Sequence, residues 1–374
     1  MNTQEVLQSV GYPEDYLVLD FESYYDAKYS LSKMSIIEYI KDEQFELLGC
    51  GFGSIDNTWF VTPSDLKDYI SGLDWFSFTT VVKNAKFDVL ILQEIFGITP
   101  TYIIDVEDLS RHLDSRAKHS LKELAVRYKL GTKGRTEDFK GLHWADMDKT
   151  KRKALADYCL NDVSLEYQLF ELLLPQLTNP TLEIPLMRHT LDVYLNPMIN
   201  FDFEKADELI EAMGLEMLSA IAKTTHTAKD IRGDISFAKL LLAALGDDAV
   251  PTKPGKPTKN MIKLLGKSGV IPALAQDDEG RKILLEHPNK QVQLLIRTRI
   301  AAKKWPLHIK RVRNLIAQAK ANSGKLAVPL KYYGAHTGRW SGSGGINLQN
   351  LGGAGRGKAI HPLIGAIRGL LYAG

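Results

Sequence analysis

One short stretch near the N-terminus, LVLDFE at residues 17–22, limits most strictly how this chain folds. An apolar run of the kind found in buried strands is followed by two carboxylates with one Phe between them. Side chains on a strand alternate between its two faces, so Asp20 and Glu22 project to the same side. Two like charges held this close repel each other unless a positive group lies beside them. The sequence therefore predicts a buried strand whose end needs a cation.

The first half of the chain alternates segments typical of strands with segments typical of helices. Short runs rich in β-branched and apolar residues predict strands, and longer runs with apolar residues at helical spacing predict helices. The predicted strands are Tyr16–Asp20, Met34–Ile40, Leu47–Phe52, Trp59–Thr62 and Phe78–Val82, and the predicted helices are Pro63–Gly72, Ala85–Phe96, Ser120–Tyr128 and Lys151–Leu174. This order predicts an α/β domain with a mixed central sheet and flanking helices.

A change of pattern near the three prolines at positions 175–185 marks a domain boundary. Beyond it the pattern is mainly helical, except for the predicted loop PTKPGKP at 251–257. The predicted helices are Pro185–Tyr194, Phe203–Ala222, Ser236–Leu245, Thr258–Leu265 and Lys290–Ala321. Residues 334–374 contain 12 glycines, which indicates a loop-rich end.

Charge is distributed unevenly along the chain, although the formal net charge is only +2. Residues 1–180 hold 19 basic and 29 acidic side chains, whereas residues 181–374 hold 28 basic and 16 acidic ones. An acidic half joined to a basic half favours metal chemistry in the first and a polyanionic partner in the second. The alternative interpretation is that charged side chains are merely spread unevenly over the solvent-exposed surface.

Several classes of protein are disfavoured by the sequence. No apolar run reaches the roughly 18 residues of a membrane span, and the first residues do not have the pattern of a secretory signal. The two cysteines, Cys50 and Cys159, give no disulfide framework. We therefore expect a cytoplasmic protein.

Two further polar motifs supply partners for the acidic strand end. Asn84 and Asp88 lie at a predicted junction between strand and helix, and Tyr158 and Asp162 lie four residues apart in a long predicted helix. Residues four apart share one face of a helix. The four carboxylates of these segments can converge in one cleft and hold two hard divalent cations through oxygen ligands.

Two divalent cations about 3.5–4 Å apart can catalyse phosphodiester hydrolysis. One makes water acidic enough to attack, and the other stabilises the leaving 3′ oxygen. Tyr158 is a candidate for orienting the water, because a protonated phenol donates a hydrogen bond. Each motif alone has a commoner structural explanation, such as a solvated strand end, a helix N-cap or chance spacing. Their order and context together favour the functional interpretation.

The motifs DFE, NAKFD and YCLND resemble those of the DEDD 3′–5′ exonucleases, in the subclass that carries a tyrosine. The stretch HSLKELAVRY resembles the helix before the third motif in that family. The resemblance implies an RNase H-like fold and two Mg²⁺ or Mn²⁺ ions. By this resemblance the metal ligands are Asp20, Glu22, Asp88 and Asp162, and the residue that orients water is Tyr158.

For other polar residues in or near these motifs, the sequence indicates a role less specifically. Asn84 is a candidate contact to the substrate strand. Lys133, Arg135 and Lys140 lie in a polar loop between two predicted helices, and we interpret them as solvated.

The basic half contains GAHTGRWSG at 334–342, followed by INLQN at 346–350. Small residues allow close backbone approach, and an arginine with several amides can donate to phosphates or base edges. A generic glycine-rich loop is the alternative. HTGRWSG and INLQN resemble a signature with which family A DNA polymerases grip primer–template DNA. By this resemblance the residues that contact the duplex are Arg339, Asn347, Gln349 and Asn350.

The remainder of the basic half resembles the same family. LDVYLNPMINFD resembles the segment that enters the thumb, and the basic helix around Ile296–Ile316 resembles the one that leads to the palm. The resemblance implies an exonuclease domain at 1–177, then a mainly helical thumb and the beginning of the palm at 178–374. Residues 287–374 contain no carboxylate side chain. We therefore expect no polymerisation by this chain alone, and either a second polypeptide that carries the rest or a truncated gene.

The leading hypothesis is a 3′–5′ exonuclease that removes 3′-terminal nucleotides from DNA, beside a region that holds primer–template. Two alternatives stay open. One is a non-catalytic DNA-binding subunit of a split polymerase. The other is an exonuclease that acts on RNA, since the acidic motifs alone do not separate the two nucleic acids. The segments TGRWS and INLQN favour DNA.

Overall fold

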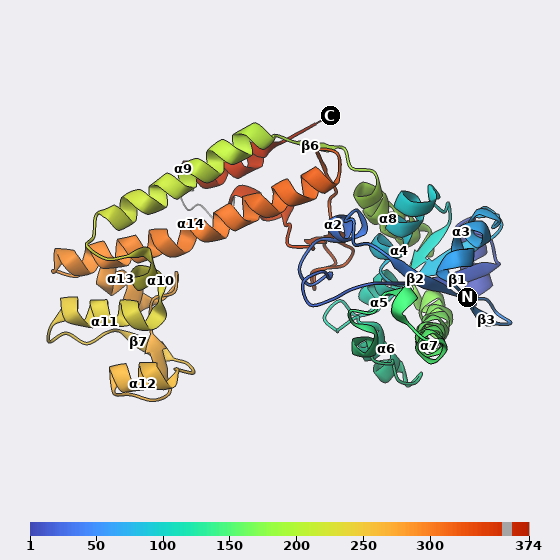
Figure 1. The fold of residues 1–374 in the computed structure, drawn as a ribbon, viewed down its shortest axis with the longest axis horizontal. Helices are drawn as coiled ribbons and strands as arrows, with labels where there is room; N and C mark the ends of the chain where they lie inside the picture. Colours follow the sequence, from blue (N-terminus) through green and yellow to red (C-terminus); the bar gives the residue numbers. More distant parts are fainter. Residues whose placement is uncertain (354–360, 374) are drawn as a thin grey trace. The chain divides into compact units, whose positions relative to one another are not determined.

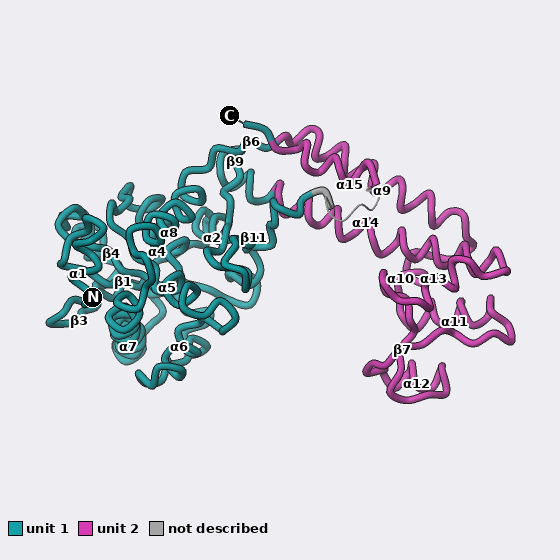
Figure 2. Tube along the Cα trace, turned by 180° about the vertical axis from the view of Figure 1, so that it is seen from behind, with its two compact units in different colours: residues 1–201, 317–351, 372–374 teal, residues 202–316, 352–371 magenta. Residues whose placement is uncertain are grey.

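The computed structural model describes residues 1–353 and 361–373. The chain divides into two compact units, shown in different colours in Figure 2. The first unit comprises Met1–Phe201, Ala317–Leu351 and Tyr372–Gly374, and the second comprises Asp202–Ile316 and Gly352–Leu371. The domain boundary expected at residue 177 stays a prediction.

A five-stranded sheet that includes β1, β2 and β3 forms the centre of the first unit (Figure 1). Its strand order is β3-β2-β1-β4-β5. Its strands are β1 (Tyr16–Ser23), β2 (Leu47–Gly53), β3 (Thr58–Val61), β4 (Thr79–Val82) and β5 (Ile103–Asp105). β2 runs antiparallel to β1 and β3, whereas β4 runs parallel to β1 and β5. The mixed central sheet expected from the sequence is therefore confirmed.

Helices flank this sheet, and β1 separates two apolar cores. The helices of the first unit are α1 (Thr3–Ser9), α2 (Ile36–Ile40), α3 (Pro63–Ser71), α4 (Ala85–Phe96), α5 (Val106–Leu113), α6 (Leu121–Tyr128), α7 (Lys149–Leu173) and α8 (Pro180–Leu195). Leu17 and Leu19 belong to the core that contains the buried face of α4, and Val18 belongs to the core that contains the second half of α7. By strand alternation Asp20 and Glu22 continue the side of Val18.

The strand predicted at Met34–Ile40 is wrong, because this segment contains the short helix α2. Ser35 caps α2: its hydroxyl oxygen accepts from the backbone N–H of Glu38, and the Glu38 carboxylate accepts from the backbone N–H of Ser35 at 2.9 Å. This reciprocal cap outweighs the β-propensity of the isoleucines. β5 and α5, which follow one another without a loop, were not predicted from the sequence.

Short strand pairs complete the first unit. β6 (Ile199–Phe201) pairs with β9 (Lys325–Leu326), and β10 (Leu330–Lys331) pairs with β11 (Ser341–Gly342), both antiparallel. The second pair carries the glycine-rich segment at 334–342 whose motif resembles that of the polymerases.

The second unit is mainly helical, as expected, and two long helices lie side by side in it (Figures 1 and 2). Its elements are α9 (Phe203–Ala222), α10 (Ala228–Arg232), α11 (Asp234–Leu245), β7 (Thr252–Pro254), α12 (Lys259–Leu265), β8 (Val270–Pro272), α13 (Glu279–Leu285), α14 (Lys290–Ala321, whose last residues belong to the first unit) and α15 (Pro362–Gly365). The loop predicted at 251–257 is wrong in part, because β7 pairs there with β8. No helix in the described residues is long and apolar enough to cross a membrane.

Glycines on β2 let α7 approach the sheet closely. Gly51 is the register partner of Asp20, and Gly53 is the register partner of Val18. A Cβ on Gly51 would lie 2.7 Å from Cys159 Sγ, and one on Gly53 would lie 2.6 Å from a methyl carbon of Val163. Distances this short are incompatible with a side chain on the glycine unless the facing side chain or the helix shifts. The glycines therefore set the separation at which α7 faces the acidic end of β1.

We expect Gly51→Ala to lower the free energy of unfolding by about 1–3 kcal/mol, because the added methyl overpacks the contact with α7. Urea unfolding followed by circular dichroism measures the change. The matched control is Gly214→Ala in α9, where an added Cβ meets no atom within 4 Å. That change should stabilise the helix by up to about 1 kcal/mol. Equal and small effects of both substitutions would contradict close packing at Gly51.

Candidate active site

Two carboxylates at the end of β1 contribute to the site. One donor atom each from Asp20, Glu22 and Cys159 lie within 4.8 Å of one another. Burial raises the pKa of the Cys159 thiol, so the sulfur keeps its proton. Its S–H is directed to the backbone oxygen of Asp20, at 3.4 Å. The donors suited to a hard cation in this group are therefore the two carboxylates.

Asp88 of α4 fixes the edge of β1 between these two acids. It is 2% exposed, and its Oδ1 accepts the backbone N–H of Phe21 at 3.1 Å. β4 pairs with β1 only as far as Val18, so the strand leaves this N–H free for a side chain. The structure thus brings Asp88 to the same strand end as the two acids, as the sequence predicted.

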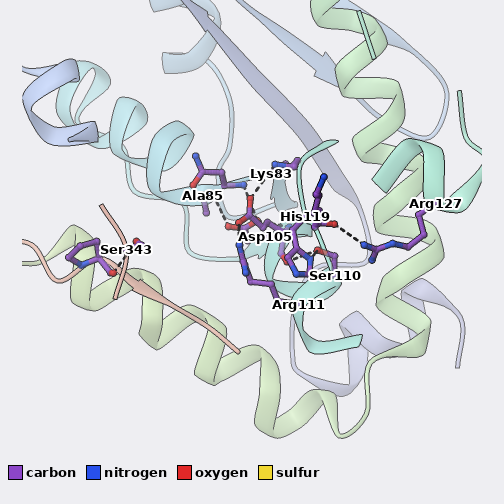
Figure 3. Close-up of polar contacts among 12 residues, drawn as sticks. Lys83, Ala85, Asp105, Ser110, Arg111, His119, Arg127 and Ser343 are labelled. Carbon is purple, nitrogen blue, oxygen red and sulfur yellow. Dashed lines mark hydrogen bonds and ion pairs between the residues drawn. The ribbon is translucent and has the colours of Figure 1, made fainter. Parts of the chain in front are cut away.

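The first turn of α4, which positions Asp88, is held by an acid from a different strand. Asn84 has left-handed backbone geometry, with φ 71°, and its side chain does not cap the helix. Instead, the Asp105 carboxylate accepts the backbone N–H groups of Asn84 at 3.0 Å and Ala85 at 2.8 Å. Figure 3 shows Asp105 beside Ala85, with Lys83 and Arg111 close by. Asp105 therefore has a structural role at the N-terminus of α4.

Asp162 and Tyr158 reach the site from α7. Asp162 is 1% exposed, and its Oδ2 forms an ion pair with Lys133. Its Oδ1 is buried without a hydrogen-bond partner among the described residues. Burial and the negative charge of Asp162 raise the pKa of Tyr158, so the phenol keeps its proton and can donate a hydrogen bond. All five residues predicted for catalysis from sequence are thus brought to one region.

The acids of this region oppose one another's ionisation. Burial raises the pKa of Asp20 to about 7, and the negative charge of Asp162 adds to the rise. Burial also raises the pKa of Glu22 and the pKa of Asp88, and in both cases the carboxylate of Asp20 adds to the effect. A cation bound here would offset both the burial and the mutual repulsion of these carboxylates, so the charge density favours cation binding.

Glu166 is a fifth acid of this region, and it was not predicted from the sequence. It lies one turn after Asp162 on α7, is 3% exposed and has a buried Oε2 without a hydrogen-bond partner among the described residues. Burial raises the pKa of Glu166, and the charges of Asp20 and Asp88 add to the rise. The spacing 158, 162 and 166 places three polar side chains on one face of α7, which is the signal that could have revealed it.

Lys133 corrects the interpretation of the loop before α7 as solvated. Its ammonium forms the ion pair with Asp162 and lies 4.9 Å from the centre of the Tyr158 ring. Arg135 and Lys140 of the same loop are exposed, as expected. No sequence pattern marks such a contact for a lysine in a polar loop, because the contact depends on how the loop folds back over α7.

The donor set fits divalent cations such as Mg²⁺ or Mn²⁺. Carboxylate oxygens are the ligands that these hard ions prefer, and two buried carboxylate oxygens, Asp162 Oδ1 and Glu166 Oε2, lack hydrogen bonds within the described part of the chain. A bound cation is one physical solution for such oxygens.

The side chains expected to contact DNA lie in the first unit. Asn84 is half-buried beside the α4 terminus, whereas the four polar side chains predicted to contact DNA on the 339–350 segment are exposed. Gln349 donates to the backbone oxygen of Trp340 at 3.1 Å, and Arg339 donates to Thr337 at 3.2 Å. The exposed set comprises Arg339, Asn347, Gln349 and Asn350. Their contact with DNA stays a prediction.

A comparison with protein families matches residues 40–178 to a model described as 3′–5′ exonuclease. This segment includes Asp88, Tyr158 and Asp162. It begins after β1, so Asp20 and Glu22 lie outside it. No match was found among curated proteins.

Solved structures that match part or all of this chain include the polymerase domain of Pol1, NrnC and an RNase D. The polymerase domain of Pol1 from M. smegmatis, in complex with DNA primer-template and dNTP, has a TM-score of 0.54 at 17% identity and covers 98% of this chain and 56% of its own. NrnC of Brucella melitensis has a TM-score of 0.36 at 15% identity, over 50% of this chain and 84% of its own. RNase D of Trypanosoma brucei, in complex with RNA U12, has a TM-score of 0.37 at 13% identity, over 52% and 68%.

The chain spans 56% of the length of the Pol1 chain that it matches. The likeness to that chain shows the fold, and the family match identifies the nuclease segment. The resemblance stated from the sequence is therefore confirmed: residues 40–178 match the family model of a 3′–5′ exonuclease domain, within a chain that has the fold of the Pol1 polymerase domain.

Proposed function

We propose that the first unit hydrolyses the terminal phosphodiester bond at the 3′ end of DNA with two divalent cations. The observation that carries the proposal is the convergence of acids from three separate segments. Asp20 and Glu22 come from β1, Asp88 from α4, and Asp162 from α7. Buried acids with raised pKa values at one place are typical of catalytic centres.

In this proposal each group of the chain has a defined task. The four carboxylates would hold the cations, which when bound would supply the Lewis acidity for activating water and for neutralising charge on the leaving 3′ oxygen. The protonated hydroxyl of Tyr158 donates a hydrogen bond that orients the attacking water. Phe21 keeps the Asp88 carboxylate in place through its backbone N–H. The chemistry thus depends on positioning by β1 and on one oriented water.

DNA is the proposed substrate for two reasons. The chain has the fold of a polymerase domain whose solved structure contains DNA primer-template, and its second half carries a large excess of basic side chains. Basic side chains neutralise phosphates whatever the sequence of the nucleic acid. The exposed polar side chains of the segment 339–350 add amide and guanidinium donors suited to phosphates and base edges.

We expect the double substitution Asp20→Asn/Glu22→Gln to lower 3′-terminal hydrolysis by more than about 100-fold, because it removes two cation ligands. The assay follows release of mononucleotides from single strands that carry a 3′ label, in the presence of Mg²⁺. The matched control is Glu43→Gln, which changes an exposed acid of the same unit. The same assay on RNA strands of equal sequence tests the preference for DNA.

Equal activity of the double variant and the wild-type chain would contradict the proposed function. Faster cleavage of RNA than of DNA would contradict the proposed substrate and leave the site assignment intact. If the double variant is inactive but still binds duplex DNA, with the usual loss of affinity at high salt, nucleic-acid binding is separate from the nuclease centre.

We expect Tyr158→Phe to lower the turnover number by up to about 100-fold, because the attacking water loses its orienting hydrogen bond. The ring stays in place against Phe139, whose centroid lies 5.8 Å away, so folding should not change. Binding of Mn²⁺, measured by titration, should equal that of the wild-type chain. A turnover number within twofold of wild type would show that the hydroxyl takes no part.

A further inference from the structure

Lys133 reaches the acidic site from a loop that α7 holds in place. The side-chain amide of Asn161 donates to the backbone oxygen of Thr132 at 3.2 Å. Gly134 lies flat against the Tyr158 ring, where a Cβ would come within 2.6 Å of a ring carbon. These two contacts fix the residues on either side of Lys133. The contacts of this loop with α7 therefore determine the position of the Lys133 ammonium.

The ammonium of Lys133 acts on more than one acid. It pairs with Asp162 Oδ2, and its charge also favours the ionised forms of Asp20 and Glu22. The side chain of Lys133 is 24% exposed, whereas that of Asp162 is 2% exposed. Lys133 is thus a partly solvated cation at the edge of a buried anionic cluster.

A divalent cation and Lys133 require the same carboxylate. Asp162 is one of the four proposed ligands, and its Oδ1 is the oxygen that the ammonium leaves unpaired. A cation that takes both oxygens, or that draws the carboxylate toward Asp20, must displace the ammonium from Oδ2. Cation binding then includes the free-energy cost of breaking this ion pair.

We propose that Lys133 is a positioning residue of the nuclease centre that competes with divalent cations for Asp162 and so sets the cation concentration at which the site fills. This inference rests on the proposed function, because it takes Asp162 as a cation ligand. It predicts that removal of the ammonium strengthens cation binding. A lysine that only braces the loop would have no such effect.

The test measures Mn²⁺ binding to the full chain by electron paramagnetic resonance of the free ion. Lys133→Met removes the charge and keeps the aliphatic length, and Lys133→Gln serves as a second variant. The matched control is Lys140→Met, which changes an exposed lysine of the same loop. We expect Lys133→Met and Lys133→Gln to lower the apparent Kd for Mn²⁺ by about fivefold, and Lys140→Met to leave it unchanged.

Thermal unfolding gives an independent readout. Without divalent cations, both Lys133 variants should unfold at a lower Tm than the wild-type chain, because the acids lose their counterion. At saturating Mn²⁺ this difference should shrink, because the cation replaces the ammonium. A lysine that only braces the loop would lower the Tm equally in both conditions.

The outcomes separate this inference from the proposed function. If the wild-type chain binds Mn²⁺ and Asp20→Asn/Glu22→Gln does not, the metal assignment stands. An apparent Kd for the Lys133 variants equal to or weaker than wild type then overturns the competition. If the wild-type chain binds no Mn²⁺, both the proposed function and this inference fail.

Discussion

The close approach of α7 to the sheet is the contact on which the rest of the site depends. Gly51 and Gly53 are the register partners of Asp20 and Val18, and neither leaves room for a side chain beneath the helix. This spacing lets acids from a strand and a helix far apart in the sequence share one small volume. The glycines therefore matter to function through geometry, although they carry no reactive group.

The same geometry concentrates negative charge at a cost in stability. Asp162 and Asp88 are buried beside the half-buried Asp20 and Glu22. The pKa values of Asp20, Glu22 and Asp88 rise as a result. Asp162 keeps one buried oxygen without a hydrogen bond within the described residues. Natural proteins accept such local conflict mainly at functional sites. Lys133 and divalent cations are, in our proposal, alternative ways to offset this charge.

Period-two alternation in LVLDFE was enough to predict β1 and the shared face of its acids, because that signal is local. Motif spacing likewise found Asp88, Tyr158 and Asp162. The strand predicted at Met34–Ile40 was wrong because the apolar residues were weighed above a local signal, the capping box of Ser35 and Glu38 that starts α2. Lys133 was missed for a different reason, because the position of its loop depends on tertiary packing against α7. Glu166 was within reach of sequence reasoning, because it repeats the four-residue spacing of the motif before it.

The central claim is that acids from β1, α4 and α7 together bind the catalytic cations. Anomalous diffraction from crystals soaked in Mn²⁺ measures this most directly. We predict two peaks about 3.5–4 Å apart, in contact with carboxylate oxygens of Asp20, Glu22, Asp88 and Asp162. Peaks confined to other surfaces of the chain, with these carboxylates unbound at saturating Mn²⁺, would contradict the claim.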